Sequence, residues 1–101
     1  MISRIRLYKK LKRPSDAFHA LGNISRLAIL YTLAREPMEF GRLARRIKIS
    51  PTLLSHHLKQ LRDTGWVTRM KVGNLVTYYV AEDSLKKIVV TLRSYLSPQS
   101  V

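Results

Sequence analysis

The sequence predicts a mainly α-helical fold that carries one β-hairpin, and three observations lead to this prediction. Apolar residues recur with helical spacing in several segments of the 101-residue chain, and the spacing changes to alternation between Trp66 and Val80. Only four glycines and four prolines interrupt these patterns. We expect four helices, then two strands, then a last helix, within the single domain that this length suits.

The first two predicted helices are bounded by residues that favour helix ends. Ser15 and Asp16 are expected to open the first helix, and Gly22 suits its end. Asn23 is a favourable N-cap for the second helix, which Pro37 ends. The spacing predicts one buried face on the second helix, made of Leu27, Leu30, Tyr31 and Ala34.

A short turn separates the third predicted helix from the fourth. Ser50 is a good N-cap and Pro51 suits the first helical position, so this boundary is clearly marked. The fourth helix is expected to run to Thr64 and to stop at Gly65. The buried face of the third helix is predicted to consist of Phe40, Leu43, Ala44 and Ile47.

The remaining elements are a hairpin and a last helix. Strand-forming residues flank Gly73 and Asn74, a pair that favours a tight two-residue turn. Asp83 or Ser84 is expected to cap the last helix, and Pro98 to end the ordered chain. The last helix has a wide apolar stripe of Leu85, Ile88, Val89, Leu92, Tyr95 and Leu96.

The charge of the chain indicates a polyanionic partner. Lysine and arginine number 19 against 6 acidic residues, which gives a net charge of +13. Six of the cations lie in the first thirteen residues, and the rest of the chain still carries +7. Dispersed cations of this kind favour double-stranded DNA, because binding to phosphates releases counterions.

Composition also excludes several classes of protein. There is no cysteine, so disulfides and thiolate metal sites are excluded. No apolar run is long enough for a membrane span or a signal peptide, so we expect a cytoplasmic protein. The sequence has no paired acids, phosphate-binding glycine loop or serine triad, and we expect neither an enzyme nor a cofactor or small-molecule ligand.

The fourth helix has two faces with different chemistry. Leu54, Leu58 and Leu61 cluster on one side and are expected to face the core. The opposite side has small hydrogen-bonding groups first and a cation later, as a helix in a major groove requires. The residues of this opposite side are Thr52, Ser55, His56, Lys59 and Asp63.

The third and fourth helices and the turn between them form a helix-turn-helix, and the hairpin adds the wing. Arg69 and Lys71 share one face of its first strand, beside a tip narrow enough to approach a phosphate backbone or a minor groove. A merely solvated strand face is the alternative. The further residues predicted to contact DNA are Arg42, Arg46, Lys48, Leu53 and Asn74.

Histidine placement does not favour a metal site. His56 is predicted to point away from the core, where DNA contact is the preferred role. His57 flanks the leucine stripe and is expected to be a hydrogen-bonded structural residue, and His19 to pack or hydrogen-bond within the first helix. The two adjacent histidines face different directions, so no metal is expected.

Residues Phe18 to Val80 resemble an ArsR-type winged helix-turn-helix repressor. The resemblance rests on the runs F-H-A-L-G-N-I-S-R-L-A-I-L, F-G-R-L-A-R-R-I-K-I-S-P-T-L-L-S-H-H-L-K-Q-L-R-D-T-G-W-V and G-N-L-V-T-Y-Y-V. It implies a homodimer built through the first and last helices, with two recognition helices in successive major grooves of a palindromic operator. By position, Thr52, Ser55 and His56 match base-contacting residues of the family, and Lys59 matches a backbone contact. The residues that this places in the dimer interface are Phe18, Leu85, Ile88, Val89, Leu92, Tyr95 and Leu96.

The chain departs from the family pattern at several positions. Pro51 replaces a frequent glutamine, and Leu53 replaces a small polar residue. Lys48 occupies the usual turn glycine, which is unfavourable if the turn needs a positive φ. Glu39 and Gly41 stand where some members carry a thiolate pair, and the last helix lacks the histidines of a zinc site.

We divide the chain into a basic segment (1–13), a DNA-binding domain (14–97) and a short tail (98–101). In the basic segment, Ile2, Ile5, Tyr8 and Leu11 recur every three residues, which favours a helix that extends the dimer interface. A flexible basic arm is the alternative. The function expected is that of a sequence-specific transcription regulator acting as a repressor, and the alternative is an architectural, nucleoid-associated DNA-binding protein of low sequence specificity.

Overall fold

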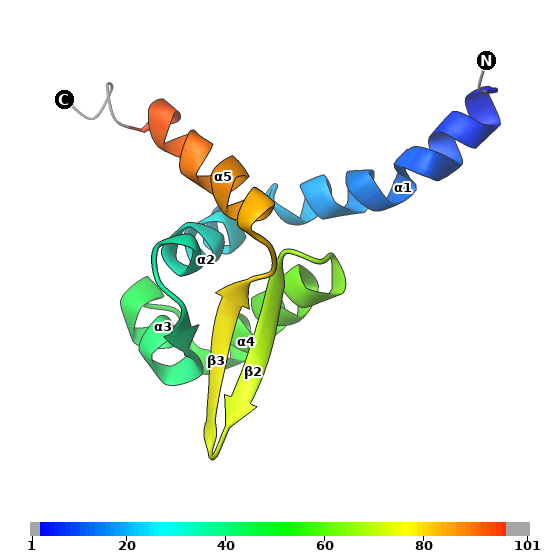
Figure 1. The fold of residues 1–101 in the computed structure, drawn as a ribbon. Helices are drawn as coiled ribbons and strands as arrows, with labels where there is room; N and C mark the ends of the chain where they lie inside the picture. Colours follow the sequence, from blue (N-terminus) through cyan, green and yellow to red (C-terminus); the bar gives the residue numbers. More distant parts are fainter. Residues whose placement is uncertain (1–2, 97–101) are drawn as a thin grey trace.

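The computed structural model describes residues 3–96, and their helices and strands follow the predicted order with one short strand added (Figure 1). The predicted fold class, mainly helical with a hairpin, is confirmed. The elements are α1 (Arg4–Ala20), α2 (Ile24–Arg35), β1 (Met38–Glu39), α3 (Phe40–Ile47), α4 (Pro51–Asp63), β2 (Val67–Val72), β3 (Leu75–Val80), α5 (Asp83–Thr91) and the 3-10 helix η1 (Leu92–Tyr95).

Helix α1 includes both the basic segment, for which a helix was favoured, and the first helix that was predicted to start at Ser15. Its N-cap is Ser3, whose Oγ accepts a hydrogen bond from the Arg6 amide at 3.2 Å. The helix then passes through Pro14 and continues to Ala20, so the predicted start at Ser15 is wrong. Ser15 and Asp16 favour a helix start, but here they lie inside a helix that is already formed. Residues 4–13 are therefore helical and continuous with the rest of α1.

The buried face of helix α2 overlaps the predicted one only in part. Ile29, Leu30 and Leu33 are fully buried, and only Leu30 was assigned to the buried face. Tyr31 and Ala34 are half-buried against the core, whereas Leu27 is half-buried outside it. The helix is apolar on more than one side, so a single stripe taken from the spacing finds only part of its buried face.

A strand of two residues, β1, was not predicted. Met38 pairs with Tyr78 and Glu39 pairs with Thr77, which gives a three-stranded sheet in the order β1-β3-β2. Two residues are too few to produce an alternating pattern in the sequence. The side chain of Glu39 then caps α3 by accepting hydrogen bonds from two backbone amides.

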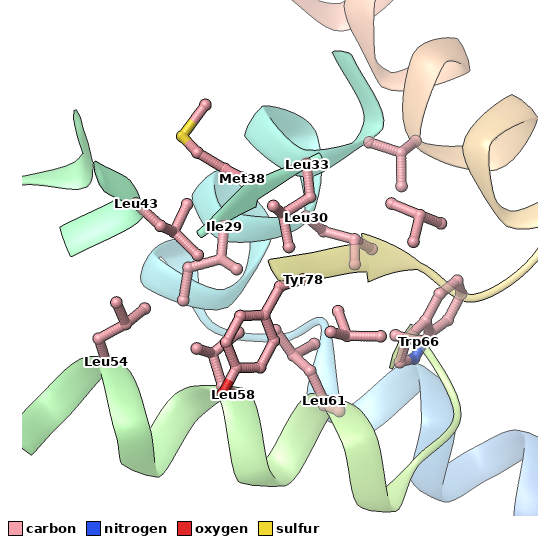
Figure 2. Close-up of a cluster of buried hydrophobic side chains, with 14 of the residues drawn as sticks. Ile29, Leu30, Leu33, Met38, Leu43, Leu54, Leu58, Leu61, Trp66 and Tyr78 are labelled. Atoms are coloured by element: carbon pink, nitrogen blue, oxygen red, sulfur yellow. The ribbon is translucent and has the colours of Figure 1, made fainter. Parts of the chain in front are cut away.

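Helix α4 is anchored to the core as the sequence predicted. Ser50 caps it, with Oγ accepting from the Leu53 amide at 3.2 Å, and Pro51 is its first residue. Figure 2 shows the leucines of α4 pointing at the buried side chains of α2, with Tyr78 of β3 and Trp66 beside them. The three core leucines, all with no exposed surface, are Leu54, Leu58 and Leu61.

The hairpin formed by β2 and β3 turns at Gly73 as predicted. Val72 pairs with Leu75 next to the turn, and Gly73 has a φ of +62°, which a residue without Cβ adopts easily. We call this hairpin the wing. In Figure 1 its tip lies at one end of the molecule, and the free ends of α1 and α5 lie at the other.

The last helix differs from its predicted form at both ends. Its N-cap is Glu82, without a side-chain capping bond, so neither Asp83 nor Ser84 caps it. The α-helix stops at Thr91 and continues as η1, so the predicted stripe does not follow one regular helix. Pro98, the 98–101 tail and Ile2 lie outside the described residues. None of the described helices is both long and apolar enough to cross a membrane.

Candidate nucleic-acid interface

The outward face of α4 carries the predicted polar side chains. Thr52, Ser55, His56 and Lys59 are all exposed, on the side of the helix away from its buried leucines. Leu53, in the first turn, is 43% exposed. Because the leucines fix the rotation of the helix in the core, the polar face is held toward solvent.

An ion pair occupies part of this face. The Nζ atom of Lys59 lies 2.9 Å from Oδ2 of Asp63, one helical turn later. The hydrogen bond from Lys59 holds the pKa of Asp63 below its ordinary value. Asp63 is therefore charged at neutral pH and offsets part of the positive potential of Lys59.

Helix α3 and the turn after it supply further cations. Arg42 forms an ion pair with Glu36, with 2.8 Å between Nη1 and Oε1, and Arg46 is exposed. Lys48 has φ 63° and ψ 49°, the left-handed conformation, and its amide donates to the Ala44 carbonyl at 2.8 Å. The turn does require a positive φ, and a lysine adopts it here with its side chain exposed.

The wing has its cations on one face. The strand register places Arg69 opposite Tyr78 and Lys71 opposite Val76, so both cations lie on the side of the sheet where Tyr78 joins the core. Asn74 is exposed at the tip. Within residues 3–96, the ion pairs leave Arg46, Lys48, Arg69 and Lys71 without an acidic partner. These cations are available to an external anion.

The histidines lie partly as predicted. His56 is exposed, as expected, but His19 is also exposed rather than packed within α1. His57 is 6% exposed, and its Nδ1 has no hydrogen-bond partner among the described residues, so the expected hydrogen-bonded role is wrong for this atom. Burial, followed by the charges of Arg26 and His56, lowers the pKa of His57 from its ordinary value. In the part of the chain that the structure describes, no three histidine or acidic side chains gather as metal ligands would.

The residues predicted for a dimer interface divide into three groups by burial. Phe18, Ile88, Tyr95 and Leu96 are exposed. Val89 is only 1% exposed and belongs to the core of its own chain. The predicted residues Leu85 and Leu92 are half-buried, the first against the core.

An apolar groove between α2 and the C-terminal helical segment was missed by the sequence analysis. It has a volume of about 430 Å³. Ile24, at 85% exposure, lies at its edge. The excess of apolar residues on α2, beyond those that one buried stripe needs, is the signal that predicts a second face. The groove is lined by Ile24, Leu27, Ala28, Tyr31, Leu92, Tyr95 and Leu96.

Comparisons with known proteins agree with this geometry. Residues 24–69 match the family model described as bacterial regulatory protein, arsR family. The chain is 34% identical over 70 residues to the nodulation protein NolR of Rhizobium meliloti, a match that covers 69% of this chain and 57% of NolR. It therefore spans little more than half of that relative's length. It is also 32% identical over 82 residues to the uncharacterized HTH-type transcriptional regulator MJ1325 of Methanocaldococcus jannaschii, covering 80% of this chain and 92% of MJ1325.

A solved structure supports the fold. The homodimeric winged helix-turn-helix DNA-binding domain Mb0332 from Mycobacterium bovis superposes with a TM-score of 0.85 at 22% identity, over 97% of this chain and 90% of that one. At this identity the likeness shows the fold, a winged helix-turn-helix, and the sequence matches show the family. The resemblance found in the sequence is confirmed: the chain belongs to the arsR family of bacterial regulatory proteins, which are transcription regulators.

Proposed function

We propose that this chain is a sequence-specific transcription regulator that binds a palindromic operator as a homodimer and represses transcription by occluding it. The observation that carries the proposal is the two-sided recognition helix α4. Its leucines are fully buried, so the helix is rigidly held while Thr52, Ser55 and His56 remain exposed. A short, hydrogen-bonding helix start is the surface that fits the major groove.

Each exposed group has a distinct role in this proposal. The hydroxyls of Thr52 and Ser55 and the imidazole of His56 hydrogen-bond to base edges, and Lys59 contacts a phosphate. Asn74 at the wing tip meets the minor groove. The cations that contact the sugar-phosphate backbone, and so position the protein without reading sequence, are Arg42, Arg46, Lys48, Arg69 and Lys71.

The homodimer is supported by apolar surface at the end of the molecule away from the wing. This surface includes the groove that Ile24 and Tyr95 line, and Phe18 and Ile88 are exposed apolar residues on α1 and α5. The Mycobacterium bovis domain of the same fold is homodimeric. A two-fold dimer presents two copies of α4, so its operator is a palindrome with half-sites about one helical turn apart. A regulator of this kind acts in the cytoplasm, at the nucleoid.

Selection of bound fragments from random DNA at two salt concentrations tests the proposal. We expect one palindromic sequence to be enriched at both, and a dimer in solution. Neutralising about 6 to 10 phosphates predicts a loss of roughly 10³ to 10⁵ in affinity between 50 and 200 mM salt. Equal binding to the selected operator and to a shuffled duplex contradicts sequence-specific regulation and favours an architectural DNA-binding protein.

A further inference from the structure

An exposed apolar side chain lies beside the polar face at the start of α4. Leu53 is 43% exposed, whereas the leucines of α4 that belong to the buried core have no exposed surface. Its amide donates to Ser50 Oγ at 3.2 Å, so the helix cap fixes its backbone. Its neighbours Thr52, Ser55 and His56 are exposed polar residues. Membership of the buried core therefore does not account for a leucine at this place.

The chemistry of the major groove limits what such a side chain can contact. Base edges there present hydrogen-bond acceptors and donors, together with one apolar group, the C5-methyl of thymine. A leucine placed over N7, O6 or an exocyclic amine removes water from a polar group without replacing its hydrogen bond, which is unfavourable. Against the methyl of thymine, the same side chain buries apolar surface on both partners.

We infer that Leu53 contacts the C5-methyl of a thymine and so specifies thymine at one position of each operator half-site. The inference rests on the proposed function, because it needs α4 to lie in a major groove. The proposed function does not say which base each exposed residue selects, and this inference names the base for one of them. Leu53 is then a specificity-determining residue, beside the hydrogen-bonding residues of the same helix.

Thr52 is the main competitor for this role, because its side chain also ends in a methyl group that thymine can meet. Isolated exposed leucines are also common on protein surfaces, so exposure does not by itself establish a contact. The experiment therefore has to remove the thymine methyl alone, and then to assign the effect to one residue.

Deoxyuridine in place of thymidine removes the methyl and leaves the base pair intact. The probe is a duplex of roughly 30 base pairs, enough for two half-sites, carrying the operator selected from random DNA. Each thymine is exchanged in turn and the dissociation constant is measured. For one symmetric position we expect about fourfold weaker binding per half-site, and about fifteenfold for both, from the loss of one buried methyl on each side.

Two variants assign the methyl to a residue. Leu53→Ser is expected to bind the thymidine and deoxyuridine operators equally, whereas Thr52→Ser is expected to keep the full preference for thymidine. Circular dichroism and thermal unfolding check that both variants are folded. Loss of the preference in Thr52→Ser and not in Leu53→Ser overturns the inference. An unchanged preference in Leu53→Ser also overturns it, because deoxyuridine then acts through the shape of the DNA.

The failure of this inference is distinguishable from failure of the proposed function. If wild-type protein selects the operator over a shuffled duplex but tolerates deoxyuridine at every position, the proposed function is supported and the proposed role of Leu53 is contradicted. If wild-type protein does not distinguish the operator from the shuffled duplex, the proposed function itself is contradicted.

Discussion

Lys59 and Asp63 form an ion pair of 2.9 Å on the face of α4 that we expect to meet DNA. The pair joins a cation suited to a phosphate contact with a carboxylate that repels phosphate. Both side chains are largely exposed, so the pair contributes little to stability. Its main effect is expected on binding, because Asp63 competes with DNA for the ammonium group.

We predict that Asp63→Asn strengthens binding to operator and to shuffled duplexes by the same factor, of several-fold. Removing the carboxylate frees Lys59 and removes a repulsion without changing any base contact. Lys59→Gln is expected to weaken binding to both duplexes and to reduce the salt slope by about one per protomer. Binding titrations at a series of salt concentrations measure both effects. Asp83→Asn on α5 makes the same charge change elsewhere. An equal gain in DNA affinity in that control means that the effect comes from net charge and not from the place of Asp63 on α4.

The wing cations are predicted to act on DNA affinity without changing sequence preference. Replacing Arg69 and Lys71 together by glutamine removes two phosphate contacts per protomer, so the salt slope is expected to fall by about two per protomer. Affinity for operator and shuffled duplexes is expected to fall in parallel. Lys86→Gln with Lys87→Gln, the same charge change on α5, is the control. If the wing variant keeps the wild-type slope, its strand face is only solvated.

The apolar groove predicts a variant that is folded but monomeric. Ile24 is 85% exposed, so Ile24→Glu does not disturb the core of its own chain. Burying an unpaired carboxylate in a dimer interface is unfavourable by about 3 kcal/mol or more, which raises the dimer dissociation constant at least about a hundredfold. Sedimentation equilibrium measures this change. Leu75→Glu, at an exposed apolar position on the wing, is expected to remain dimeric, and a dimeric Ile24→Glu protein contradicts the proposed interface.

Local signals in the sequence predicted the DNA-facing half of the fold. Ser50 and Pro51 mark the start of α4 by capping chemistry, and the Gly73 turn marks the hairpin. Both depend on residues adjacent in sequence, which is why they are predictable. The exposure of the predicted DNA-contacting side chains follows from the helical spacing of the leucines that oppose them.

The half of the fold away from DNA depends on contacts between residues that are distant in sequence. Trp66 Nε1 donates to the Ala17 carbonyl at 2.7 Å, which ties α1 to the end of α4, and no local pattern indicates this bond. Helix α2 has apolar residues for two faces, and which face is buried depends on where α4 and β3 pack. The unpaired Nδ1 of His57 is likewise a consequence of packing. Sequence spacing alone does not determine which of these residues pack against distant parts of the chain.

His57 predicts a loss of stability in mild acid. Burial lowers its pKa in the folded protein, so below the ordinary value of 6.5 the unfolded chain takes up a proton first. The stability that neutral His57 contributes is therefore complete above pH 6.5 and is lost as the pH falls toward the lowered pKa. We expect the free energy of unfolding of wild type, relative to His57→Gln, to decrease as the pH falls below about 6.5. Urea denaturation measures it, and a constant difference contradicts the prediction.

The left-handed conformation of Lys48 gives a prediction that separates stability from binding. A Cβ in this conformation destabilises the folded protein by roughly 1 to 2 kcal/mol. Glycine removes this strain, but its more flexible unfolded chain lowers the free energy of unfolding by about 0.5 to 1 kcal/mol. Lys48→Gly is therefore expected to be about 0.5 to 1 kcal/mol more stable than Lys48→Ala in urea denaturation.

These two variants form a matched pair, because both lack the ammonium group and differ only in Cβ. Their affinities for DNA are expected to be equal and lower than that of wild type, since both lose the same phosphate contact. Lys48→Arg keeps a cation and the strained backbone, so it is expected to match wild type in both measurements. Equal stability of the glycine and alanine variants means that the turn relaxes when lysine is removed, and that the lysine was not strained. A difference in stability without a difference in affinity places the strain in the turn and the binding contribution in the charge.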